Sequence, residues 1–104
     1  MSNSSPNPEN TKPVTVEIVF CTACNWLLRS SWMAQEILST FSSEVAKLSL
    51  IPSKDAGQFE IRVNKETIWE RKKEGGFPTV KELKQRVRDQ INPEMDLGHV
   101  DNKK

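Results

Sequence analysis

Two cysteines, Cys21 and Cys24, are the residues of this chain best suited to chemistry. They form a Cys21-Thr22-Ala23-Cys24 motif, a spacing that brings two sulfurs close enough for a disulfide at the start of a helix. The free amides and partial positive charge of a helix start stabilise a thiolate. Such a thiolate attacks a substrate disulfide, and the second cysteine then resolves the mixed disulfide. The motif therefore predicts thiol–disulfide chemistry.

Two other interpretations of the cysteines stay open. The cysteines could fill space in the core, because free cysteine behaves as a small hydrophobe. They could also supply half of a zinc site, which would need two further ligands. The single histidine, His99, is far from the motif in the sequence, and we interpret it as a solvated residue of the tail.

Length and charge limit the class of protein. The chain has 104 residues, which favours one domain, and its formal charge is 15 − 14 = +1, which argues against nucleic acid as a partner. No apolar run is long enough to cross a bilayer, and the amino terminus does not resemble a secretory signal, so we expect a cytoplasmic protein without a membrane partner. Residues 1–13 are expected to be disordered, residues 14–92 to form the domain and residues 93–104 to form a tail.

The segments that must position the cysteines alternate between strand and helix patterns. Residues 14–20 alternate between apolar and polar side chains, which predicts a strand ending at the motif. Residues 24–42 have helical periodicity, with an apolar arc expected to face the sheet. The members of that arc are Trp26, Leu27, Met33, Ala34, Ile37, Leu38 and Phe41.

Three more strands and a second helix complete the predicted fold. The strands are expected at 44–51, 58–63 and 66–71, the last two forming a hairpin. Thr79 and Glu82 form a capping box that begins the second helix. The order β-α-β-β-β-α predicts an α/β protein of the α+β sandwich type. A Cys-x-x-Cys motif in a β-α-β unit is typical of a thioredoxin-like redox motif. Its four-stranded mixed sheet would carry both helices on one face and leave the other face wet.

The chain resembles the selenoprotein W-related (Rdx) family, in the branch whose bacterial members carry cysteine. The resemblance rests on the strand–Cys-Thr-Ala-Cys–helix segment and on three further segments, and it covers roughly residues 14–101. These segments are Gly57-Gln58-Phe59-Glu60, Gly75-Gly76-Phe77-Pro78 and Leu97-Gly98-His99-Val100-Asp101.

This resemblance implies a thioredoxin-like fold and a role in redox homeostasis, with glutathione or a thioredoxin-type protein as the reductant and no bound cofactor. In animal selenoprotein W a selenocysteine stands at the position of Cys24, which implies that Cys24 is the reactive group. The geometry of a helix start favours Cys21 instead. Both cysteines are therefore candidate catalytic residues, and the attacking one stays undecided from the sequence.

Several residues near the motif are candidates for contact with a substrate or partner. Leu28 and Trp32 lie opposite the apolar arc, which indicates an exposed apolar pair and a docking surface for an unidentified protein. An equally open alternative is that Trp32 folds over against the tail or the second helix. The other candidates are Thr22, Ala23, Gly75, Gly76, Phe77 and Pro78. A basic cluster, which is usually a solvated face but could attract the carboxylates of glutathione, consists of Arg71, Lys72, Lys73, Lys81, Lys84, Arg86 and Arg88.

The sequence thus favours a small thiol–disulfide oxidoreductase that uses Cys21 and Cys24. A redox-gated binding module, in which the pair changes the surface at Leu28 and Trp32 without turnover, is the second hypothesis. An adaptor with purely structural cysteines is the third.

Overall fold

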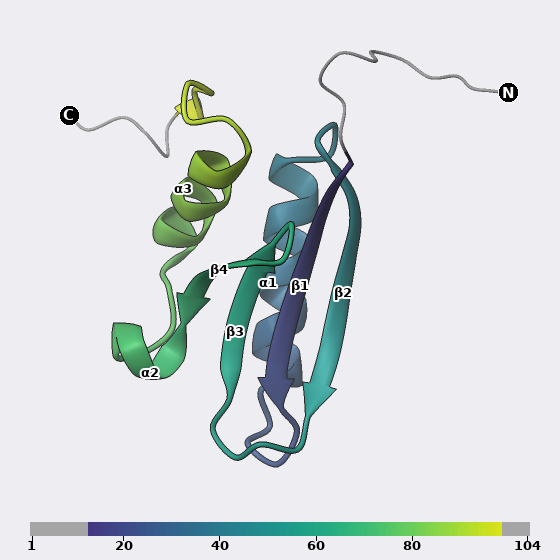
Figure 1. Cartoon of the computed structure of the whole chain (residues 1–104), viewed down its shortest axis with the longest axis vertical. Helices are drawn as coiled ribbons and strands as arrows, with labels where there is room; N and C mark the ends of the chain where they lie inside the picture. Colours follow the sequence, from purple (N-terminus) through teal and green to yellow (C-terminus); the bar gives the residue numbers. More distant parts are fainter. Residues whose placement is uncertain (1–12, 99–104) are drawn as a thin grey trace, which may run out of the picture.

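A computed structural model describes residues 13–98 as a four-stranded sheet with helices (Figure 1). The elements are β1 (Val14–Cys21), α1 (Leu27–Thr40), β2 (Val45–Ser53), β3 (Phe59–Val63), β4 (Glu66–Glu70), α2 (Arg71–Glu74) and α3 (Val80–Ile91). The order is the predicted one, with the single turn of α2 added after β4. Residues 1–12, for which we expect disorder, lie outside the part of the chain that the structure describes. The tail residues 99–104, including His99, also lie outside it.

The sheet has the mixed topology expected from the order of its elements. Its strands follow the order β2-β1-β3-β4, with β1 parallel to β2 and the other pairs antiparallel. Ile18 lies opposite both Leu50 of β2 and Ile61 of β3, so apolar residues line up across three strands. The turn between β3 and β4 consists of Asn64 and Lys65, both with positive φ, as a two-residue hairpin turn requires.

Both long helices cover one face of this sheet. α1 packs on β1 and β2, while α3 packs on β3 and β4 and also contacts α1. Lys84 of α3 forms an ion pair with Glu36 of α1 at 3.0 Å. The fully buried side chains between these layers include Ile18, Ile37, Phe41, Phe59, Ile61, Leu83 and Val87. The prediction of two helices on one face is therefore confirmed.

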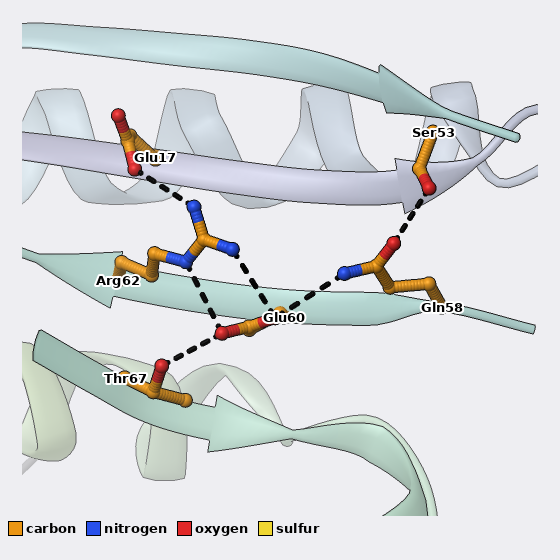
Figure 2. Close-up of polar contacts among 6 residues, drawn as sticks. All are labelled: Glu17, Ser53, Gln58, Glu60, Arg62 and Thr67. Carbon is orange, nitrogen blue, oxygen red and sulfur yellow. Dashed lines mark hydrogen bonds and ion pairs between the residues drawn. The ribbon is translucent and has the colours of Figure 1, made fainter. Parts of the chain in front are cut away.

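The opposite face carries a network of polar side chains (Figure 2). Arg62 donates to Glu17 at 3.2 Å and to Glu60 at 3.1 Å, and Thr67 donates to Glu60 at 2.7 Å. Gln58 donates to the same carboxylate, and its side-chain carbonyl accepts from Ser53. The network links all four strands and ends at the loop that follows β2.

The first helix differs from its prediction in start and orientation. It begins at Leu27 rather than at residue 24, because Asn25 has a φ of 60°, which no right-handed helix accommodates. Leu27 and Leu38, expected against the sheet, are 51% and 42% exposed, whereas Ser30 is fully buried. The contact with the sheet is narrower than the predicted arc, so residues at the edge of the arc lie outside it.

Two smaller boundaries also differ. β2 continues to Ser53, because Pro52 lies on an edge strand, where its missing N–H breaks no ladder. β4 ends at Glu70, whose side chain accepts a hydrogen bond from the Lys73 amide and caps α2. Beyond residue 92, Met95 and Leu97 pack partly buried against the core.

Candidate functional site

The two cysteines lie at the end of β1, in different degrees of burial. Cys21 is the last residue of β1, is 1% exposed and donates its amide to the Gln58 carbonyl at 2.8 Å. Cys24 follows in a turn and is half-buried, and both thiols are free. One thiol of the pair is therefore reachable from solvent while the other is covered.

A tight turn, rather than a helix, holds Cys24 near Cys21. Thr22 donates its amide to the Ser53 carbonyl at 3.1 Å, and the Asn25 amide reaches the Thr22 carbonyl at 3.4 Å. Because α1 begins only at Leu27, Cys24 precedes its first turn by three residues. The helix therefore starts later than the sequence predicts, and Cys24 lies outside its first turn. Activation of the thiol by the start of the helix stays a prediction.

Hydrogen bonds close to the sulfurs change the pKa of both thiols. A hydrogen bond with the Cys24 side chain lowers the pKa of Cys21, and bonds from the backbone at Gly57, Cys24 and Ala23 lower it further. The bond to Cys21 and burial raise the pKa of Cys24, although the Gly57 backbone and the charge of Arg71 oppose them. The pKa of Cys21 is thus lowered and that of Cys24 raised, and because the two thiols interact, they titrate as a pair.

The loop after β2 reaches the sulfurs through Gly57. This glycine has a φ of 77°, and a Cβ at its position would lie 3.2 Å from the Arg71 Nη2 atom. Arg71 donates from Nε to the Gly57 carbonyl at 3.2 Å, and its guanidinium lies 5.0 Å from the centre of the Trp26 ring. A residue from the predicted basic cluster therefore belongs to the site.

An aromatic cluster lies beside the motif. Trp26 packs edge-on against Phe77 with ring centres 5.0 Å apart, and Phe59 packs against Phe77 at 4.8 Å. The guanidinium of Arg29 lies 4.3 Å from the centre of the Phe77 ring. This cluster joins the segment after α2 to the turn that carries the cysteines, although 53 positions separate Cys24 from Phe77 (77 − 24).

The other residues predicted from the Gly-Gly-Phe-Pro segment have structural contacts. Gly75 ends α2 with a φ of 82°, and the Gly76 carbonyl accepts from the Trp69 indole at 2.9 Å. Pro78 is buried, next to the Thr79 cap of α3. Only Phe77 of this segment has a described contact with the residues next to the cysteines.

The outer face of α1 is apolar and close to the motif in sequence. Leu28 is 82% exposed and Trp32 is 42% exposed, and the exposed Leu27 and Leu38 extend the same helix surface. Apart from Arg29, the exposed residues of α1 are uncharged. Thr22 and Ala23, between the cysteines, are also exposed.

Three members of the seven-residue basic cluster, Lys84, Arg86 and Arg88, form ion pairs. Arg86 pairs with Glu74 at 3.0 Å, and Arg88 pairs with Asp89 at 2.7 Å. Within residues 13–98, no group of three or more His, Cys, Asp or Glu side chains is placed to hold a metal ion. In the same part of the chain, no helix has the length and apolar character needed to cross a membrane.

Sequence reasoning missed Gly57 and Arg71 as parts of the site. Gly57 stood within a segment used for the resemblance, and Arg71 stood in a basic run. No spacing rule connects either residue to Cys24, because the sheet and α2 bring them together.

Comparisons with known proteins agree on one family. The Rdx family model matches residues 15–89. A selenoprotein W-related protein from Vibrio cholerae is 53% identical, with a TM-score of 0.75, and the match covers 78% of this chain and 100% of that chain. A protein from Bordetella parapertussis is 48% identical, with a TM-score of 0.74 and coverage of 77% and 100%. The search among curated proteins gave no match.

Proposed function

Because this chain belongs to the Rdx family, whose fold is thioredoxin-like and whose members are generally associated with redox roles, we propose that it is a thiol–disulfide redox protein acting through Cys24 and Cys21. One observation carries the proposal. Two free thiols, the buried Cys21 at the end of β1 and the half-buried Cys24 in the turn that follows, lie three positions apart with one of them open to solvent. This arrangement suits a pair that forms a disulfide with little movement of the backbone.

The reaction balances without any bound cofactor. The Cys24 thiolate attacks one sulfur of a substrate disulfide, forms a mixed disulfide and releases the other substrate sulfur as a thiolate. The Cys21 thiol then loses its proton, which the released substrate thiolate accepts, and the resulting Cys21 thiolate attacks the Cys24 sulfur and expels the second substrate thiolate. The substrate gains two electrons, and Cys21 and Cys24 become a disulfide. A thiol reductant reverses both steps.

Access decides which cysteine attacks. The low pKa favours placing the thiolate on Cys21, but that residue is only 1% exposed and cannot meet a substrate sulfur directly. Although the bond to Cys21 and burial raise the pKa of Cys24, we place the attacking thiolate there, because a substrate sulfur can reach this half-buried residue. Cys24 is therefore the attacking cysteine and Cys21 the resolving one.

The reductant in this proposal is glutathione or a thioredoxin-type protein, and the setting is the reducing cytoplasm, where a free dithiol is maintained. The role is redox homeostasis. The chain needs no nucleic acid or membrane for this activity.

Single substitutions of the cysteines test the proposal. Cys21→Ser removes the resolving thiol, so a mixed disulfide with glutathione should accumulate at Cys24 after exposure to glutathione disulfide. Cys24→Ser leaves only the buried thiol, and its adduct should form at least about tenfold more slowly. Mass spectrometry of the intact proteins distinguishes the two. Equal and slow labelling of both variants, at the rate of an ordinary thiol, would refute the proposal.

A second candidate function is a redox-gated binding module without turnover. The observation that favours it is the exposed apolar pair Leu28 and Trp32 on α1, where Arg29 is the one charged exposed residue of the helix. A protein partner would contact this surface, with Thr22, Ala23 and the segment from Gly75 to Pro78 at its border. Formation of the disulfide would then change the turn beside the surface rather than reduce a substrate.

A further inference from the structure

We propose that Arg71 is a positioning residue of the redox site, which holds the Gly57 loop against the cysteine turn through the Gly57 carbonyl and the Trp26 ring. This inference rests on the proposed function, and it assigns to α2 a role that the cysteines alone do not reveal. No substrate contact is required of Arg71.

The geometry shows three elements meeting at one guanidinium. Arg71 opens α2, donates from Nε to the Gly57 carbonyl at 3.2 Å, and lies 5.0 Å from the centre of the Trp26 ring. Gly57 belongs to the loop after β2, and Trp26 follows Cys24 by two positions. A half-buried planar guanidinium thus fastens the loop to the cysteine turn by a hydrogen bond on one side and a cation–π contact on the other.

The contact with Arg71 selects one conformation of the Gly57 backbone, because glycine adopts positive and negative φ with similar ease. Its φ of 77° is accessible to glycine, and a side chain there would also press against Arg71 at 3.2 Å. Glycine at this position therefore avoids both backbone strain and a close contact with the end of the Arg71 side chain. Holding the peptide in this conformation keeps its backbone directed at both cysteines.

The charges around the pair agree with this assignment. The Gly57 backbone lowers the pKa of Cys21 and of Cys24, and the Arg71 charge lowers the pKa of Cys24, against the effect of the Cys21 charge. Lys72 also approaches, with its Nζ atom 3.9 Å from the position of a Gly57 Cβ. Of these two basic residues, only Arg71 has both a hydrogen bond to Gly57 and a ring contact with Trp26.

Three variants distinguish two effects of Arg71: its contacts with Gly57 and Trp26, and its positive charge. Arg71→Gln removes both, Arg71→Lys keeps the charge but loses the planar fork, and Lys73→Gln removes an equal charge from an exposed position of the same turn. The rate of alkylation of the thiols by iodoacetamide is measured against pH. In parallel, NMR follows the chemical shift of the Gly57 amide through the same titration. If Arg71 only stabilised the fold, its substitution would not change how this shift responds to ionisation of the thiols.

The expected results differ among the variants. Arg71→Gln should raise the pKa of the reactive thiol, so that alkylation at pH 7 slows about tenfold. Arg71→Lys should slow it roughly threefold, and Lys73→Gln should stay within about twofold of the parent. The Gly57 amide shift should follow the thiol titration in the parent protein and lose most of that response in both Arg71 variants.

Two outcomes overturn the inference. One is a Gly57 amide that does not respond to thiol titration in the parent protein, and the other is Arg71→Lys alkylation equal to that of Lys73→Gln. Circular dichroism confirms that each variant is folded, and the Arg71→Lys comparison still decides the matter if Arg71→Gln is not. By contrast, an inability of the parent cysteines to form a disulfide at all would refute the proposed function, whatever the Arg71 variants show.

Discussion

At the scale of single residues, Cys21 and Cys24 have the same side chain but different surroundings. Cys21 gains hydrogen bonds and burial from the end of β1, while Cys24 keeps access to solvent from the turn that follows. The motif and the direction of its chemistry could be predicted from the sequence. The order of attack could not, because it depends on burial, which the spacing of two cysteines does not determine.

A charged side chain away from the cysteines gives a prediction about pH. Burial opposes ionisation of Glu60, but hydrogen bonds from Arg62, Thr67 and Gln58 outweigh it and lower its pKa below the ordinary 4.5. The carboxylate therefore stabilises the fold above about pH 4.5, and this stabilisation is lost as pH falls through the lowered pKa. Glu60→Gln should cost about 1 kcal/mol at pH 7 and much less near pH 3.

Urea unfolding at both pH values measures this difference. Glu66→Gln, at an exposed position of β4, is the matched control, and its effect on the free energy of unfolding should depend little on pH. A cost for Glu60→Gln that stays constant from pH 7 to pH 3 would contradict the assignment of a stabilising carboxylate to the network in Figure 2.

At the scale of elements, the strands and α3 follow directly from the sequence, whereas α1 does not. Alternation in β1 and β3 and the capping box at Thr79 are local signals, and each appears in the structure as predicted. The start of α1 depends on the positive φ of Asn25, and α2 depends on a cap from Glu70. Neither the start of α1 nor the presence of α2 can be predicted from the spacing of apolar residues.

The exposed face of α1 yields a prediction for the binding hypothesis. Trp32→Ala should leave the fold intact, with a change in the free energy of unfolding below about 1 kcal/mol, because the ring is 42% exposed. The same variant should lose a protein partner that the parent retains in only one redox state, as measured by affinity capture with reduced and oxidised protein. Gln35→Ala, exposed on the same helix, is the control and should retain it.

Unfolding of the Trp32→Ala protein would show that the ring belongs to the core. Equal capture by the parent and the variant would show that the surface of α1 does not bind the partner. Either result would remove the support for a redox-gated module and leave thiol exchange as the function.

At the scale of the whole molecule, the sheet brings distant segments to one end of β1. The mixed order β2-β1-β3-β4 places β1 centrally, so its last residue lies between the end of β2 and the start of β3. From the other side, α2 supplies Arg71 and the segment after it supplies Phe77 (Figure 1). This convergence explains why two cysteines in a nearly neutral chain acquire a defined environment.

The central claim, that Cys21 and Cys24 form a reversible intramolecular disulfide, is tested most directly by equilibration in glutathione redox buffers. Mass spectrometry of the intact protein follows the oxidised fraction. We predict a monomer lighter by two hydrogens, with a reduction potential between roughly −200 and −300 mV and full recovery on reduction. Thiols that stay reduced across this range, or oxidation that yields mainly disulfide-linked dimers, would contradict the account.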